Sequence, residues 1–228
     1  MKVALVIAAH PDDEVLGCGA TIARLADEGW SVHVVIVAEG ATSRNVMRDP
    51  ALHEQELSEL ARCAEVANGI LGAASVKLLS LPDNRMDGME LLDVVKIVET
   101  EIERHRPGVV LTHHAGDVNV DHRVLHDAVI TACRPQPGHS VRTLLFFEVP
   151  SSTEWRPAAS GMQFSPDYFY DVTDSLDRKL AALNAYAPEM RAFPHPRSVK
   201  AVEHLAGWRG ATIGCAAAEA FMLGRAII

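Results

Sequence analysis

The sequence predicts an α/β fold of the Rossmann-like type, an open and mostly parallel sheet with helices on both faces. Short runs rich in Val, Ile and Leu alternate with longer stretches of helical periodicity, and this alternation is typical of βαβ units. The chain has 228 residues, of which 48% are hydrophobic and 22% charged. This composition allows a sizeable buried core.

Five segments are predicted as strands because each is short, apolar and rich in β-branched residues. They are residues 2–9, 31–38, 75–81, 108–114 and 141–149.

Helices are predicted at residues 15–28, 51–67 and 89–105, where apolar side chains recur at helical spacing. The first ends at Gly29 and the last stops before Pro107, and both residue types are common helix terminators.

The pattern changes after the fifth strand. Residues 150–168 are rich in Ser, Pro and Gly and are predicted as a long loop. A helix near residues 174–186 and a helical C-terminal region interrupted by two glycines are expected to follow. We therefore expect residues 1–228 to form a single α/β domain, with residues 150–228 as a loop-rich and helical elaboration.

Composition excludes several classes of protein. The formal charge of −9 argues against a nucleic-acid partner, because Lys and Arg supply most of that affinity. No apolar run approaches the roughly 20 residues of a bilayer-spanning helix, so no membrane span is expected. The N-terminal apolar run leads directly into acidic residues, which favours a first strand over a signal peptide and a cytoplasmic location. A homo-oligomer remains open.

Polar segments follow three of the predicted strands. "HPDDE" follows the first strand, "EGATSR" the second and "HHAGDVNVDH" the fourth. Ligands of open parallel sheets bind outside the carboxyl ends of the strands. The polar residues therefore gather where this fold places a binding site.

The first of these segments carries candidate metal ligands. His10 and Asp13 lie three residues apart at one turn, and His122 in "NVDHR" is a third candidate. Two imidazoles and one carboxylate leave positions for water, as catalytic zinc requires. The adjacent Asp12 is a candidate general base, so the sequence favours a metal-dependent hydrolase.

Other interpretations stay open. One of the acids could simply cap the helix that follows. The same ligands could hold Fe²⁺ for oxygen chemistry, although an oxygenase needs no base beside its metal. Gly17 and Gly19 suggest a nucleotide-binding module, but the neighbouring acids would repel a pyrophosphate and the glycine fingerprint is incomplete. A non-catalytic metal-binding protein is a further alternative.

The stretch "AAHPDDEVLGCGATIARLADEG" resembles the signature of the LmbE-like, or PIG-L, zinc-dependent de-N-acetylases. "NVDHR" is similar to the second motif of that family, often H-P-D-H, and the resemblance extends into "HPRSVKAVEHLAGWRGATIGCAAAEAF". It implies that His10, Asp13 and His122 hold zinc, or Fe²⁺ or another divalent metal, and that Asp12 is the general base. The implied substrate is a small N-acetylated amino sugar or its conjugate, such as one of N-acetylglucosamine. An amidase acting on a thiol–sugar conjugate stays an alternative.

The resemblance implies further roles. Arg44 and Asp83 lie where sugar-binding residues of the family fall, and His195 is similar to a late histidine that stabilises the oxyanion or protonates the leaving amine. Asn119 stands where the H-P-D-H motif has its first histidine, and an amide cannot titrate, so the general acid is left open. Asp121 is expected to orient a neighbouring ligand as an outer-shell partner.

Overall fold

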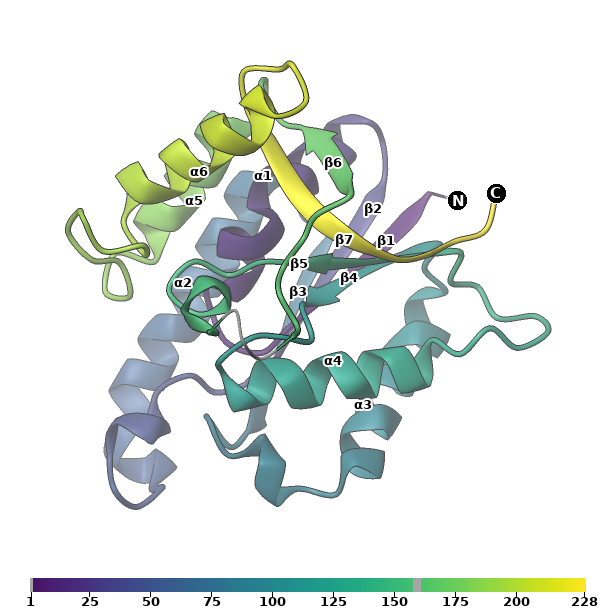
Figure 1. Cartoon of the computed structure of the whole chain (residues 1–228). Coiled ribbons are helices and arrows are strands. Elements are labelled where there is room, and N and C mark those ends of the chain that lie inside the picture. The colour runs from purple at the N-terminus through teal and green to yellow at the C-terminus, as the bar shows by residue number, and fades with distance from the viewer. Residues whose placement is uncertain (1, 158–160) are drawn as a thin grey trace.

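The computed structural model describes residues 2–157 and 161–228, and it confirms the predicted α/β class (Figure 1). Its strands form one sheet in the order β3-β2-β1-β4-β5-β7-β6. Strands β1 to β5 are parallel, and β7 is antiparallel to both β5 and β6. The strands are β1 (Val3–Ala8), β2 (Ser31–Ala38), β3 (Ser75–Leu81), β4 (Val109–His113), β5 (Thr143–Phe147), β6 (Tyr168–Asp171) and β7 (Ala218–Ala226).

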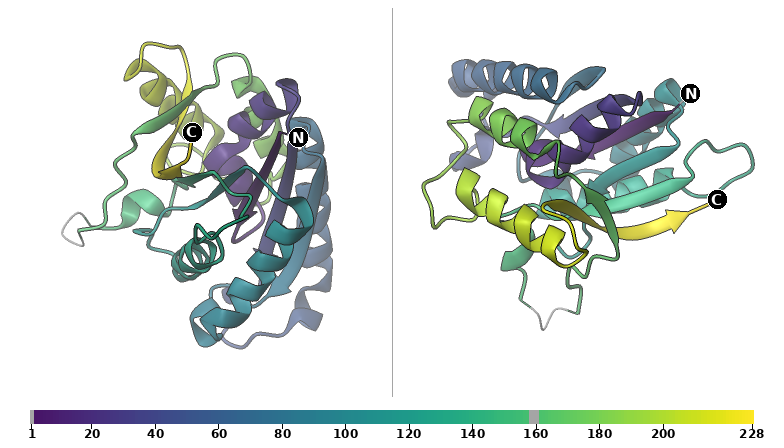
Figure 2. Two further views of the ribbon diagram at one scale, coloured as in Figure 1. Left: turned by 90° about the vertical axis from the view of Figure 1, so that its right-hand side faces the viewer. Right: turned by 90° about the horizontal axis from the view of Figure 1, so that it is seen from above.

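Helices cover both faces of this sheet (Figures 1 and 2). Helices α1, α2, α5 and α6 pack on one face, and α3 and α4 pack on the other. The central strand β1 is buried on both sides: Ala4 and Val6 join the first core, and Leu5 and Ile7 join the second. The helices are α1 (Asp13–Asp27), α2 (Glu54–Leu71), α3 (Leu91–His105), α4 (Val120–Ala132), α5 (Leu176–Ala185) and α6 (Val199–Ala211).

The C-terminal region differs from the expectation. Residues 218–226 form strand β7, where a helix was expected, because they pair between β5 and β6 and bury Phe221. Pairing with neighbouring strands overrides the helical preference of Ala, Glu, Met and Leu in this segment. Helix α4 was not predicted. The loop expected at 150–168 includes residues 158–160, which lie outside the described residues. Across the parts of the chain that the structure describes, no helix is both long and apolar enough to cross a bilayer.

The strand order positions the site. From β1 the chain moves outward through β2 and β3, then returns to place β4 and β5 on the other side of β1. The loops that follow the neighbouring strands β1 and β4 therefore run in opposite directions. Such a point, where the strand order reverses, forms the crevice in which open α/β sheets bind ligands. The segment "HPDDE" and helix α4 lie at this point.

Candidate metal centre

The turn that begins α1 contains strained backbone. Asp12 has a φ of 103°, in the left-handed region that residues other than glycine seldom adopt. Its carbonyl accepts the N–H groups of Val15 and Leu16 and so starts the helix. Among the described residues, however, no N–H group caps onto the Asp12 carboxylate. Glu14 Oε2 instead accepts the Asp12 N–H at 3.1 Å, so the Asp12 side chain is not needed for capping.

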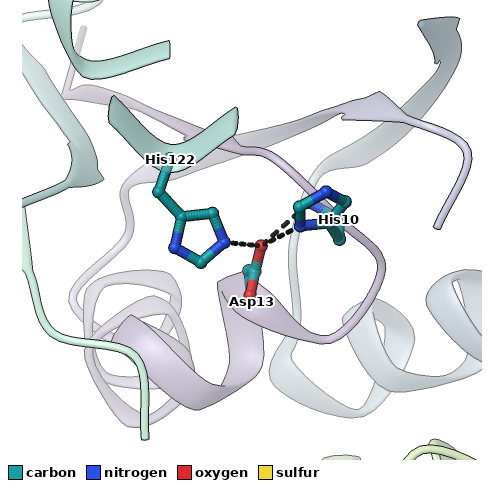
Figure 3. A group of neighbouring side chains, drawn as sticks. All are labelled: His10, Asp13 and His122. Carbon is teal, nitrogen blue, oxygen red and sulfur yellow. Dashed lines mark hydrogen bonds and ion pairs between the residues drawn. The ribbon is translucent and has the colours of Figure 1, made fainter. Parts of the chain in front are cut away.

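Three candidate ligands converge beside this turn (Figure 3). Asp13 Oδ2 lies 3.2 Å from His10 Nδ1 and 3.1 Å from His122 Nε2. One donor atom from each residue lies within 4.8 Å of the others. Ligands about 2.0–2.2 Å from a tetrahedral zinc lie roughly 3.3–3.6 Å from each other. The observed separations therefore suit a single ion.

His122 provides a second sign of a metal site. Each of its ring nitrogens lies 3.1 Å from a carboxylate oxygen, yet neither makes a hydrogen bond of acceptable geometry within the described residues. The side chain is only 2% exposed, and a buried polar atom without a partner costs stability. For His122 Nε2 and Asp13 Oδ2, this is the arrangement of two ligand atoms that point at a common ion and not at each other. The donor set therefore fits a divalent metal.

Asp121 holds the ring of His10. Its Oδ2 accepts a hydrogen bond from His10 Nε2 at 2.9 Å, and its two oxygens also accept the N–H groups of Asn84 and Met86. Asp83 Oδ1 lies 3.3 Å from the same nitrogen, which gives a second group with metal-ligand spacing. Because both Asp121 oxygens already accept backbone hydrogen bonds, we assign Asp121 as the carboxylate that orients His10 and not as a ligand.

Asp117 is a member of the site that sequence reasoning missed. It is completely buried, and its Oδ2 lies 3.1 Å from His122 Nδ1. The hydroxyls of Ser152 and Thr153 donate to its carboxylate, which fixes it behind the imidazole. These contacts and the charge on His122 hold the pKa of Asp117 below its usual range, although burial acts in the opposite direction. Nothing in the spacing of "AGDV" distinguishes this acid from a loop residue.

The carboxylates around the two histidines favour the charged form of each ring. Burial lowers the pKa of both rings, but neighbouring carboxylates outweigh it. Asp121 and Asp13 raise the pKa of His10 to about 10, and Asp13 and Asp117 raise the pKa of His122 to about 9. A metal must therefore displace these protons when it binds.

Asp12 lines a pocket of about 440 Å³ beside the ligands. Its Oδ2 lies 3.2 Å from Arg197 Nη1, while Arg197 Nε donates to Ser151 Oγ at 3.0 Å. Burial raises the pKa of Asp12 well above its usual range, although the guanidinium of Arg197 acts in the opposite direction. The arginine therefore orients this carboxylate and supports its charged form.

The structure places three further candidates in this pocket: Arg44, Asp83 and Asn119. Arg44 Nη2 donates to Glu189 at 2.7 Å, so its guanidinium is ion-paired at the pocket wall. Asn119 Oδ1 accepts the N–H of Asp121 and caps α4, the helix that carries His122. Position 119 therefore acts structurally, which an amide does without titrating.

His195 lies outside the residues that line the pocket. Its Nδ1 accepts the N–H of Arg197 at 3.0 Å, and its ring meets the edge of Trp155 with centroids 5.9 Å apart. From the same loop, Glu189, Arg191 and Arg197 do line the pocket. A direct catalytic role of His195 stays a prediction, and Arg197 is the cation that this loop brings to Asp12.

Two other sequence features have structural explanations. A Cβ atom on Gly17 would lie 2.3 Å from Phe147 Cδ2, so this glycine permits close packing of α1 on β5. His113 Nε2 accepts the N–H of Ala9 at 2.8 Å, and its ring stacks on His122 at 3.9 Å. Both residues therefore support the site from within the core.

Comparison with known proteins decides the family. The family model described as "PIG-L: GlcNAc-PI de-N-acetylase" matches residues 5–133, more than half of the chain. The chain belongs to the PIG-L family. The matched stretch contains Asp12 and the candidate ligands His10, Asp13 and His122, whereas Arg197 lies outside it. The resemblance read from the motifs is thereby confirmed.

Similar proteins include an uncharacterized deacetylase, YaiS, of Escherichia coli K12. It is 31% identical over 188 residues, with 80% of this chain and 89% of YaiS covered. The diacetylchitobiose deacetylase of Thermococcus kodakarensis is 29% identical over 203 residues, with 82% of this chain and 69% of that deacetylase covered.

Among solved structures, the 4-carboxy-2-hydroxymuconate hydratase GalB of Pseudomonas putida KT2440 superposes with a TM-score of 0.78 at 25% identity. The match covers 100% of this chain and 98% of the hydratase. The same fold thus supports more than one reaction, and the reaction must be argued from the site.

Proposed function

We propose that this protein is a zinc-dependent hydrolase that removes the acetyl group from an N-acetylated amino sugar or its conjugate. The observation that carries the proposal is the group formed by His10, Asp13 and His122, with the carboxylate of Asp12 beside it in an open polar pocket. Two imidazoles and one carboxylate are ligands of catalytic zinc. Relatives that are named deacetylases of N-acetylated sugars support the same reaction.

The residues of this chain have distinct tasks in that reaction. Zinc in such a site polarises an amide carbonyl and lowers the pKa of bound water to about 7. Asp12 accepts the proton of the attacking water, and Arg197 holds the carboxylate in place. Asp121 and Asp117 keep the two imidazoles aimed at the ion. The products are acetate and a free amine.

The pocket wall suits a hydroxyl-rich substrate. Arg44, Asp83 and Asn119 offer donors and acceptors, and the half-exposed Trp155 adds an apolar surface for a sugar ring. The acetate-release screen described below identifies the conjugate that is hydrolysed and includes thiol conjugates. A cytoplasmic location and a homo-oligomer remain predictions.

Hydration of an unsaturated carboxylate is a second candidate. A 4-oxalmesaconate hydratase of Pseudomonas putida KT2440 is 29% identical over 200 residues, with 82% of this chain and 73% of the hydratase covered. The pocket also contains Arg44, Arg191 and Arg197, whose guanidinium groups could receive carboxylates. The family model and the deacetylase relatives favour the first candidate.

The test is an acetate-release screen of the zinc-loaded protein on N-acetylated sugars and their conjugates. The matched control is Asp12→Asn, which keeps the size of the side chain and removes the base. We expect the variant to retain zinc and to lose turnover by roughly 10²–10⁴-fold. Equal turnover of the two proteins would remove Asp12 from the mechanism. No acetate release, together with hydration of an unsaturated dicarboxylate, would establish the second candidate.

A further inference from the structure

Helix α1 is interrupted close to the metal centre. Cys18 has non-helical dihedral angles, φ −149° and ψ 25°, which divide the helix into a short first piece and a longer second piece. The first piece begins at Asp13 and follows directly on Asp12. The direction of this piece therefore determines where both carboxylates point.

A buried ion pair occupies the interruption. In a continuous helix the carbonyl of Leu16 would accept the N–H of Ala20. Here the Leu16 carbonyl accepts from Lys179 Nζ at 2.8 Å, and the Ala20 N–H donates to Glu219 Oε1 at 3.1 Å. The N–H of Thr21 donates to Glu219 Oε2 at 2.7 Å, and Lys179 Nζ lies 2.5 Å from Glu219 Oε1.

The pair comes from parts of the chain that are distant in sequence. Lys179 is on α5 and Glu219 is on β7, and each side chain is 4% exposed. Gly19 leaves room for it, since a Cβ atom there would lie 3.3 Å from Lys179 Cγ. Burying two charges costs desolvation energy, and well-packed apolar replacements are often neutral or stabilising. Stability alone therefore gives little reason for this pair.

One residue, Leu16, connects the ion pair to the site. Leu16 gives its carbonyl to Lys179 and its N–H to the carbonyl of Asp12, at 2.8 Å. A displacement of Lys179 would therefore be transmitted through Leu16 to the turn that holds Asp12 and Asp13.

We propose that Lys179 and Glu219 are positioning residues of the metal centre. Inserted into α1, they set the angle of its first turn and hold Asp13 where it can share an ion with His10 and His122. This role rests on the metal site of the proposed function. Both residues lie outside the stretch 5–133 that matches the family model, so the C-terminal region completes a site whose ligands all lie before it.

The test measures zinc affinity by competition with a chromophoric chelator, which needs no substrate. The main variant is Lys179→Met with Glu219→Met. It removes both charges together and lets the Leu16 carbonyl and the Ala20 N–H bond to each other. We expect the double variant to fold and to bind zinc about 10-fold or more weakly, the scale seen when outer-shell partners of metal ligands are lost.

The matched control is Arg178→Met. Arg178 neighbours Lys179 on α5 and also donates to a carbonyl of α1, that of Ala23 at 2.8 Å, but beyond the interruption. We expect this variant to keep the zinc affinity of the natural protein. Glu219→Gln keeps the shape of the side chain and is measured in the same way, so a poorly folding double variant does not decide the result.

The outcomes are separable. A zinc affinity within about threefold of the natural protein, in the double variant or, if that does not fold, in Glu219→Gln, overturns the proposal. An equal loss in Arg178→Met also overturns it, because general loosening of α5 against α1 would then be the cause. A protein that binds zinc as expected but releases no acetate contradicts the proposed function and leaves the positioning role standing.

Discussion

A single carboxylate, Asp13, contacts both candidate imidazoles, so proton and metal compete for the same atoms. His10 Nδ1 and His122 Nε2 lie 3.2 and 3.1 Å from one Asp13 oxygen. Without metal, positive imidazolium rings and the negative carboxylate compensate each other in a buried place. A bound dication would supply that positive charge in place of the protons.

The affinity for zinc should therefore depend on pH. The pKa of His122 is about 9 and that of His10 about 10 without metal, so both rings are protonated at pH 7 and binding must release protons. The apparent affinity should rise with pH and level off above about 10. Calorimetry in buffers of different ionisation enthalpy counts the protons. Binding at pH 7 without proton release would contradict this expectation.

The candidate ligands could be named from the sequence, and the residues behind them could not. His10, Asp12 and Asp13 are crowded into one turn after an apolar strand, where three polar residues have little structural reason to stand together. Asp117 is a lone acid in a loop, and only the fold shows it behind His122. Arg197 is equally hidden, because its contact with Asp12 spans 185 positions in the chain.

At the scale of elements, the loop between α5 and α6 brings side chains to a site whose ligands lie on other elements. Arg197 reaches Asp12 from this loop, whereas the nearby His195 contacts Trp155 and the Arg197 backbone. The loop therefore brings Arg197 to Asp12 and leaves His195 outside the residues that line the pocket.

We expect Arg197→Gln to lower kcat roughly 10²-fold with zinc retained, because a misplaced general base loses its alignment. His195→Gln should have the smaller effect. The measurement is steady-state acetate release at saturating zinc, with metal content determined for each variant. A larger loss in His195→Gln would instead support the direct role that the family resemblance implies.

Strand β7 shows why the C-terminal elements were harder to predict than the first five strands. Its sequence, "AEAFMLGRA", has the residues of a helix and no strict alternation. It becomes a strand because β5 and β6 each present a free edge to it. The central parallel strands, by contrast, are apolar enough to be predicted from their own sequence alone.

At the scale of the whole molecule, the candidate metal centre lies where the two layers of helices meet. Asp13 lies on α1, which packs on one face of the sheet, and His122 lies on α4, which packs on the other (Figures 1 and 3). The ion should therefore stabilise the fold as a unit.

We expect removal of zinc by a chelator to lower Tm. A ligand that binds only the folded state adds about 2.7 kcal/mol when its free concentration is 100 times Kd. Differential scanning calorimetry with zinc or with chelator measures the shift. Asp12→Asn should keep the zinc-dependent shift and His122→Ala should lose it. An unchanged Tm in the natural protein would show that the ion does not bind at this junction.

At Asp12, the left-handed backbone and the proposed reaction favour different residues. Glycine adopts a φ of 103° without strain, so glycine is the residue that would strain this turn least. The reaction proposed here needs an acid there. Selection for thermal stability alone should therefore favour glycine at this position and give inactive variants. Selection for turnover should retain the aspartate and its strained backbone.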